Sequence, residues 1–314
     1  MTGPGTEKSG GLSGILPVFK PEGFTSFDVI AKLRGILRTR RLGHAGTLDP
    51  MATGVLPVFA GLATKACDLL PDSDKSYIAG FRLGISTDTQ DSTGTVLSQR
   101  PFSFVTPQGL EAALAPLRGE ILQLPPMYSA VSVGGKRLYE LARQGLEVER
   151  APRPVTIRAL TLSGYDARTG EGELEISCSK GTYIRTLIHD LGEGLGCGGI
   201  MTSLVRTKAA GFTLEECVTL DTLQSRGGDF QSLLIPVERL FEALPAIRLC
   251  EAQARMYKNG VKLDLNRLDI PRDSGRFRVF GESGSGTDSP EFLGTAYADF
   301  EKGQLRTEKN FFER

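Results

Sequence analysis

The chain has 314 residues, of which 40% are hydrophobic and 24% are charged, a composition typical of a soluble globular protein with one large and one small domain. Its 37 basic and 37 acidic residues cancel, so whole-chain charge gives no indication of a nucleic-acid partner. Five scattered cysteines and two histidines, without a CxxC pair, argue against a disulfide framework and against a metal site.

The first 14 residues, MTGPGTEKSGGLSG, contain no apolar segment and are expected to form a flexible tail. No apolar run elsewhere approaches the roughly 20 residues that span a bilayer. We therefore expect neither secretion nor membrane insertion, and unpaired cysteines favour a cytoplasmic location.

The first predicted helix is TSFDVIAKLRGILR, residues 25–38. Thr25 and Asp28 have capping-box spacing, with Asp in place of the usual Glu. Helical spacing predicts one apolar stripe on this helix, formed by Phe27, Ile30, Leu33 and Leu37.

Two runs of positive charge stand out against the neutral total. Residues 32–41 contain five basic side chains and no acidic one, and residues 134–158 contain six basic side chains against three glutamates. Each run alone is most simply a solvated helix face. The first run leads directly into a glycine-rich loop, which favours a binding surface.

That loop, GHAGTLDPMATGVLPVFAGLATK, contains one aspartate, Asp49, directly before Pro50. An aspartate in a turn commonly bonds its own backbone, and a residue before proline is held in an extended conformation. Here Gly43, Gly46 and Gly54 also allow the backbone to approach a ligand closely. Asp49 is therefore either a turn former or a rigidly held nucleophile or general base.

Alternating residues predict two strands further along the chain. In YIAGFRLG, residues 77–84, the side chains on one face are Tyr77, Ala79, Phe81 and Leu83. In GELEISCSK, residues 172–180, they are Leu174, Ile176 and Cys178. This pattern is typical of an antiparallel sheet with one solvated face. After Gly181 the spacing predicts an amphipathic helix with Arg185 in its first turn.

Three further segments have local signals. A helix is predicted near Glu111–Leu117, and PPMYSAVSVGGKRLYELARQG, residues 125–145, is predicted to form a projecting loop with a short helix. After about residue 245, short strands around turns favour a small β-barrel or sandwich, with GSGTDSP, residues 284–290, as a flexible hairpin tip.

Five blocks in this order resemble the bacterial tRNA pseudouridine-55 synthase (TruB) family. They are KPEGFTSFDV, the glycine-rich stretch GHAGTLDPMATGVLPVFAGLATK, DKSYIAGFRLGISTDTQDSTG, PPMYSAVSVGGKRLYELARQG and SKGTYIRTLIHDLG. The resemblance covers about residues 15–245, and the remainder resembles that family's C-terminal PUA domain more weakly.

The resemblance implies roles for particular residues. Asp49 matches the catalytic aspartate, Tyr77 the tyrosine that stacks on the target base and takes part in the last proton removal, and Arg185 the arginine that pairs with the aspartate. Leu204 matches an apolar wall of the pocket. The implied RNA-binding and pocket residues are His44, Lys20, Leu204, Gly43, Thr47, Tyr183, Arg40 and Arg41.

The implied fold is α+β, with a mixed, mainly antiparallel sheet flanked by helices and a small C-terminal β-barrel of PUA type. The expected organisation is a tail at 1–14, a catalytic domain at 15–245 with a thumb-like insertion at about 125–152, and an RNA-binding domain at 246–314.

The implied function is isomerisation of uridine 55 in the T-loop of tRNA, on a flipped-out base, without a cofactor or metal. We expect tRNA as the partner, no membrane and no obligate protein partner, and a monomer. Two alternatives stay open: an RNA-binding or tRNA-folding protein with secondary catalysis, and a two-carboxylate glycoside hydrolase. The hydrolase lacks a second carboxylate in a comparable setting near the loop. Attack on carbon 6 of the base and on carbon 1′ of the ribose also both stay open.

Overall fold

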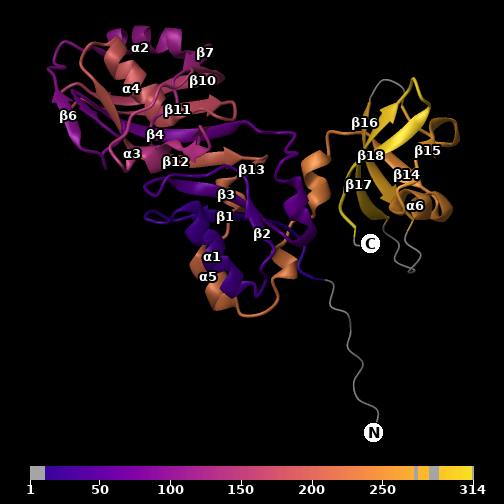
Figure 1. Cartoon of the computed structure of the whole chain (residues 1–314). Helices are drawn as coiled ribbons and strands as arrows, with labels where there is room; N and C mark the ends of the chain where they lie inside the picture. Colours follow the sequence, from indigo (N-terminus) through magenta and orange to yellow (C-terminus); the bar gives the residue numbers. More distant parts are fainter. Residues whose placement is uncertain (1–10, 272–274, 283–289, 313–314) are drawn as a thin grey trace.

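The computed structural model describes residues 11–271, 275–282 and 290–312, and it contains two main sheets (Figure 1). The larger sheet runs in the order β1 (Gly14–Lys20), β3 (Thr53–Ala60), β12 (Gly199–Ala209), β4 (Lys75–Leu83), β11 (Glu171–Cys178), β10 (Arg153–Asp166) and β7 (Gly119–Gln123). Strand β2 (Leu42–His44) pairs with β3, and β13 (Phe212–Thr213) pairs with β12. Only the β3–β12 pair in this sheet is parallel.

Helices cover this sheet in two groups. Helices α2 (Pro107–Leu114) and α4 (Ile184–Gly194) pack with β4, β10 and β11, whereas α1 (Ser26–Ile36) and α5 (Leu220–Arg226) pack with β1 and β3. Each group packs in its own apolar cluster. One cluster includes residues of β12 and the other includes residues of β3, and these two strands are neighbours in the sheet.

The predicted cap of α1 is confirmed, and one residue of its predicted apolar stripe is wrong. The Thr25 hydroxyl accepts from the Asp28 amide at 3.0 Å, and the Asp28 carboxylate accepts from the Thr25 amide at 2.8 Å. Ile30, Leu33 and Leu37 are buried as expected. Phe27 is 63% exposed instead, and its ring packs under the Arg34 guanidinium.

The other local predictions agree with the structure. The apolar faces predicted for β4 and β11 are buried, and the helix after Gly181 is α4. The helix predicted near Glu111–Leu117 is α2, which starts earlier and continues into a short 3-10 turn. This turn is η2 (Ala115–Leu117). The other 3-10 helices of the described residues are η1 (Gly61–Ala66), η3 (Leu214–Glu216), η4 (Gln231–Leu233), η5 (Val237–Phe241) and η6 (Leu265–Arg267).

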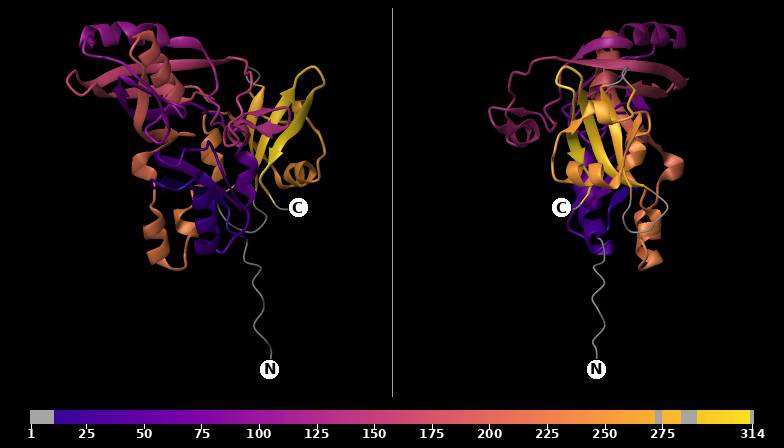
Figure 2. Two further views of the ribbon diagram at one scale, coloured as in Figure 1. Left: turned by 60° about the vertical axis from the view of Figure 1, so that its left-hand side comes forward. Right: turned by 90° about the vertical axis from the view of Figure 1, so that its right-hand side faces the viewer.

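The segment predicted to project does so. It forms the hairpin β8 (Ser132–Val133) and β9 (Lys136–Arg137), followed by helix α3 (Leu138–Ala142). The right-hand view of Figure 2 shows this segment extending away from the body of the larger unit. A second small hairpin pairs β5 (Ile85–Thr87) with β6 (Val96–Gln99).

The smaller sheet runs in the order β14 (Ala246–Leu249), β16 (Arg276–Gly281), β17 (Glu291–Asp299), β18 (Gln304–Asn310) and β15 (Leu263–Asp264). It is curled, and helix α6 (Glu251–Lys258) packs against it (Figure 1). Most of the predicted hairpin tip at 284–290 lies outside the described residues, as do residues 1–10 of the predicted tail. Strand β1 already begins at Gly14, the last residue of that tail.

The two units touch through an aromatic cluster. Phe241 stacks on Phe292 with ring centroids 6.2 Å apart, and Phe292 stacks on Phe311 at 5.6 Å. Beside them, the Lys65 ammonium donates to the Asn310 side-chain oxygen at 2.7 Å. Within the described ranges, no helix is both long enough and apolar enough to cross a membrane.

Candidate active site around Asp49

The Asp49 loop, residues 45–52, connects β2 to β3 and is anchored on both sides of the aspartate. The Leu48 amide donates to the Ser26 hydroxyl at 2.9 Å, where α1 begins. On the other side, the Pro50 carbonyl accepts from the Gly23 amide at 2.9 Å. The backbone is therefore fixed on each side of Asp49, while 38% of the Asp49 side chain is accessible.

Arg185, from the first turn of α4, contacts the Asp49 carboxylate directly. Its Nε lies 2.9 Å from one carboxylate oxygen, and its Nη2 donates to the other at 3.4 Å. Two further N–H groups donate to backbone carbonyls: Nη1 to Thr89 at 3.0 Å and Nη2 to Tyr128 at 2.9 Å. A guanidinium held at several points orients the carboxylate that it contacts.

A second carboxylate, Asp91, flanks the same guanidinium at 3.9 Å. It is buried, and one of its oxygens accepts from the Thr93 amide at 2.9 Å and from the Thr89 hydroxyl at 2.7 Å. These local bonds are those of a turn former. Its contact with Arg185 depends on tertiary structure, which a local pattern does not carry.

Tyr77 on β4 and Leu204 on β12 lie in one apolar cluster with Leu48 and Ala52 of the Asp49 loop. Tyr77 is only 7% exposed, and burial raises its pKa to about 12. Its hydroxyl therefore carries its proton near neutral pH. This cluster gives the loop an apolar, aromatic wall beside the carboxylate.

Lys20, at the end of β1, is fully buried and reaches the same loop. Its ammonium donates to the Phe24 carbonyl at 2.6 Å and to the Pro50 carbonyl at 3.2 Å. Burial lowers the pKa of Lys20 to about 8, although the nearby Asp49 carboxylate opposes that shift. Lys20 therefore supports the backbone directly after the aspartate.

Arg206 on β12 is a part of the site that the sequence patterns did not single out. It is fully buried, and its guanidinium donates to the Val55 and Gly46 carbonyls, each at 2.8 Å. It also lies opposite Tyr77 of β4, where its positive charge partly offsets the rise in the Tyr77 pKa. One signal was present: Leu204 and Arg206 are two residues apart on a strand and so share a face.

Five of the expected RNA-contacting residues lie on the approach to the loop. Arg40 and Arg41 are exposed before β2, Gly43 and His44 belong to β2, and Thr47 is exposed in the loop. Burial lowers the pKa of the half-buried His44, which favours a neutral imidazole. Each lies within nine residues of Asp49 in the chain.

Tyr183, the remaining residue of that set, immediately precedes α4 and so lies two residues before Arg185. Its amide donates to the Gln123 side chain at 2.7 Å, and its carbonyl accepts from the same side chain at 3.0 Å. Gln123, on the edge strand β7, thus fixes the start of the helix that carries Arg185.

Metal-binding side chains do not gather anywhere in the described part of the chain, where no three of His, Cys, Asp and Glu are placed to hold an ion.

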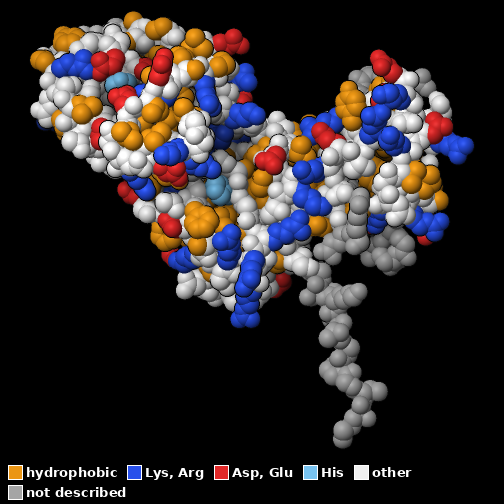
Figure 3. All heavy atoms as spheres, in the orientation of Figure 1, with side chains coloured by type: hydrophobic (Ala, Val, Ile, Leu, Met, Phe, Trp, Pro, Cys, Tyr) orange, Lys and Arg blue, Asp and Glu red, His pale blue; other side chains and the backbone are white. Residues whose placement is uncertain are grey.

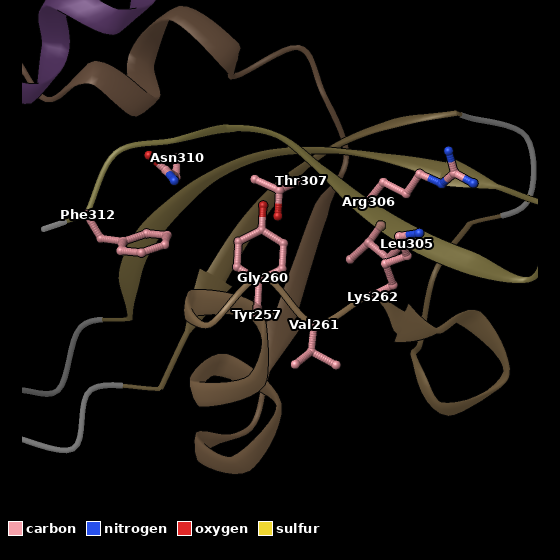
Figure 4. A pocket seen from close by; sticks show the side chains of 9 residues that line it. All are labelled: Tyr257, Gly260, Val261, Lys262, Leu305, Arg306, Thr307, Asn310 and Phe312. Carbon is pink, nitrogen blue, oxygen red and sulfur yellow. The ribbon is translucent and has the colours of Figure 1, made fainter. Parts of the chain in front are cut away.

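A separate cavity of about 290 Å³ lies in the smaller unit, between α6 and β18. Figure 4 shows its lining, in which the Tyr257 ring extends toward Thr307. The cavity is lined by Tyr257, Gly260, Val261, Lys262, Leu305, Arg306, Thr307, Asn310 and Phe312.

Comparison with known proteins places these features in a family. The model described as TruB family pseudouridylate synthase (N terminal domain) matches residues 34–184, and the tRNA pseudouridylate synthase B C-terminal domain matches residues 185–242. Proteins named tRNA pseudouridine synthase B are similar along most of their length. The one from Ralstonia nicotianae is 44% identical, covering 95% of this chain and 94% of its own. The one from Bacillus subtilis is 40% identical, covering 87% and 91%.

Solved structures confirm the predicted fold class. A Cbf5–Nop10–Gar1 complex contains a chain that aligns with a TM-score of 0.69 and 25% identity, covering 96% of this chain and 85% of that one. A chain from an H/ACA RNP bound to a substrate RNA aligns with a TM-score of 0.68 at 22% identity, covering 96% and 86%. With two family models matched across residues 34–242 and relatives above 40% identity, the chain belongs to the TruB family of pseudouridylate synthases.

Proposed function

We propose that this protein isomerises uridine 55 in the T-loop of tRNA to pseudouridine, with Asp49 as the catalytic carboxylate. The family and the names of its relatives support a tRNA substrate. The observation that carries the proposal is the 2.9 Å contact between Arg185 and a partly accessible Asp49 carboxylate, beside the apolar wall that contains Tyr77.

The reaction needs no external reagent. The bond between N1 of the base and C1′ of the ribose breaks, the base turns, and C5 bonds to C1′; C5 then loses a proton and N1 gains one. A carboxylate can form a covalent adduct with the substrate or stabilise positive charge that develops on the ribose. The contact with Arg185 orients Asp49 for either path.

Tyr77 and Leu204 are proposed to receive the extruded uracil. Enzymes that act on a base take it out of its stack, at a cost of a few kcal/mol. Stacking on an aromatic ring recovers about 1–3 kcal/mol. Because its pKa is raised to about 12, Tyr77 is better suited to stacking than to removing the C5 proton as a phenolate.

Binding of the RNA is assigned to the positive segments and to the smaller unit. Figure 3 shows a broad hollow between the two units, with Lys and Arg side chains along it. We propose that the exposed Arg40 and Arg41 contact phosphates near the loop, that His44 occupies the space that the base leaves, and that residues 246–314 bind RNA as a PUA-like domain. We also propose that the protein is a monomer in the cytoplasm.

The test uses purified protein and an unmodified tRNA transcript, with an Asp49→Asn variant as the matched control. Pseudouridine is mapped by carbodiimide labelling and primer extension. We expect one new stop at the T-loop uridine with the wild type and none with the variant. A stop elsewhere would refute position 55, and an abasic site would indicate hydrolysis. Binding without modification would favour the RNA-folding function.

A further inference from the structure

We infer that Arg206 is a positioning residue that ties Tyr77 to the backbone of the Asp49 loop. It thereby sets the placement of the aromatic wall relative to the carboxylate. Arg206 is distinct from Arg185, which contacts the carboxylate itself. This inference rests on the proposed function, and it assigns a role to a buried charge that the reaction does not otherwise use.

The position of Arg206 in the sheet makes this possible. In β12 it lies opposite Tyr77 of β4 on one side and opposite Gly54 of β3 on the other. The side chains of directly paired residues share a face and lie next to each other. Arg206 therefore lies between the strand that carries Tyr77 and the strand into which the Asp49 loop runs.

Gly54 lets the two strands approach closely at this point. Its φ is +102°, a value that L side chains rarely adopt, and a Cβ atom there would lie 2.2 Å from the Arg206 carbonyl oxygen. Since that atom belongs to the backbone, no side-chain movement would relieve the clash. The close contact places the Arg206 side chain within reach of the carbonyls at both ends of the loop.

The guanidinium uses its donors on those carbonyls. Nε donates to Val55 at 2.8 Å, after the loop, while Nη2 donates to Gly46 at 2.8 Å and Nη1 to Thr47 at 3.5 Å, before Asp49. Its side chain also lies beside that of Tyr77, the residue directly opposite on β4. One side chain thus joins the entry of the loop, its exit and the aromatic residue.

Arg206 has no carboxylate partner among the ion pairs of the described residues. Burying a charge is unfavourable, and an apolar side chain of similar volume commonly stabilises a core equally well. Stability alone therefore does not account for a guanidinium here. Its planar fork of donors does account for it, because a fork fixes several acceptors in one geometry.

The test is a double-mutant cycle of Arg206→Lys, Tyr77→Phe and the double variant, in single-turnover pseudouridine formation on saturating tRNA. Lysine keeps the charge but loses the fork. We expect Arg206→Lys to lower the rate at least tenfold and to change the Kd for tRNA less than twofold. The double variant should lose less than the product of the two single losses.

Arg118→Lys is the control, at a partly exposed arginine that also pairs with Glu111. Its guanidinium also donates to a backbone carbonyl, that of Leu160 at 2.8 Å, on the β10 side of the sheet. Its rate should stay within twofold of the wild type. Thermal unfolding of every variant shows whether a lost rate reflects unfolded protein.

Three results would overturn the inference: an unchanged rate with Arg206→Lys, a loss equal to that of Arg118→Lys, or rate losses that multiply in the double variant. If the wild type modifies no tRNA, the proposed function fails separately. In that case the wild type, the two single variants and the double variant test the link between Arg206 and Tyr77 by urea unfolding. Additive changes in the free energy of unfolding would overturn the link, and coupled changes would support it.

Discussion

Charged side chains are buried around Asp49 but partly exposed in the smaller unit. Around Asp49, Lys20, Arg185 and Arg206 are buried and bonded to backbone carbonyls or carboxylates. In the smaller unit, charges lie in partly exposed pairs such as Lys258–Glu291 and Arg306–Asp299. Buried charges are costly and rigid, whereas exposed ones are solvated and screened by salt. The first arrangement suits chemistry and the second suits binding.

The largest effect is expected where a buried charge loses its partner. Arg185→Met leaves Asp91 buried and Asp49 partly buried without their cation. We expect the free energy of unfolding to fall by about 3 kcal/mol and the turnover rate by about 10²–10³-fold. Urea unfolding and single-turnover assays measure both. The control Arg82→Met removes a half-exposed pair with Glu171 and should cost about 0–1 kcal/mol.

A smaller loss is expected when the charge is kept but displaced. Asp49→Glu moves the carboxylate by one methylene from a backbone that is fixed at Leu48 and Pro50. We expect the single-turnover rate to fall by about 10²-fold with tRNA affinity preserved. A rate within a few-fold of the wild type would mean that the loop adjusts and that its rigidity is not catalytic.

Lys20 gives a pH-dependent test of the buried region. Its pKa is about 8 in the folded protein against 10.5 as the ordinary value. Between these values the unfolded chain holds a proton that the folded chain has released, so folding stability gains as pH rises. Relative to Lys20→Met, the wild type should therefore become more stable between about pH 8 and pH 10. Urea unfolding across this range checks it, and a constant difference contradicts it.

The smallest effect is expected on the smaller sheet. Lys262 is exposed at the cavity between α6 and β18. Lys262→Gln should weaken tRNA binding about two- to threefold and reduce the salt dependence of binding by about one counterion, without changing the single-turnover rate. Lys302→Gln, at the turn between β17 and β18, is the control. A lowered single-turnover rate would show that the two regions do not divide their roles in this way.

Local patterns were sufficient for much of the fold. The cap at Thr25 and the alternation in β11 are set by neighbouring residues, so the sequence alone reveals them. Phe27 fits the apolar spacing of its helix but lies on the solvent side, because helical spacing alone does not show how wide the covered face is. No local pattern in the sequence indicated which strand pairs with β12 in parallel.

The candidate site was less accessible to sequence reasoning. Asp49 was noticeable because glycines and a proline surround it, and its role came from the family resemblance rather than from the pattern. Asp91 and Arg206 acquire their contacts from segments more than 90 residues away in sequence, to Arg185 and to the loop. An arginine within a strand is ordinarily solvated, so its burial is evident only once both neighbouring strands are in place.

The order of the site along the chain has a practical consequence. Asp49 and Tyr77 precede the exposed turn at residues 143–147, and Arg185, Leu204 and Arg206 follow it. During synthesis, Asp49 and Tyr77 are therefore made before the other three residues. A nascent chain lacks part of the site until translation has passed residue 206. Two fragments produced separately, one ending and one beginning in that turn, would each lack part of the site, and pseudouridine formation on mixing would report their assembly through the β4–β11 and β4–β12 pairs.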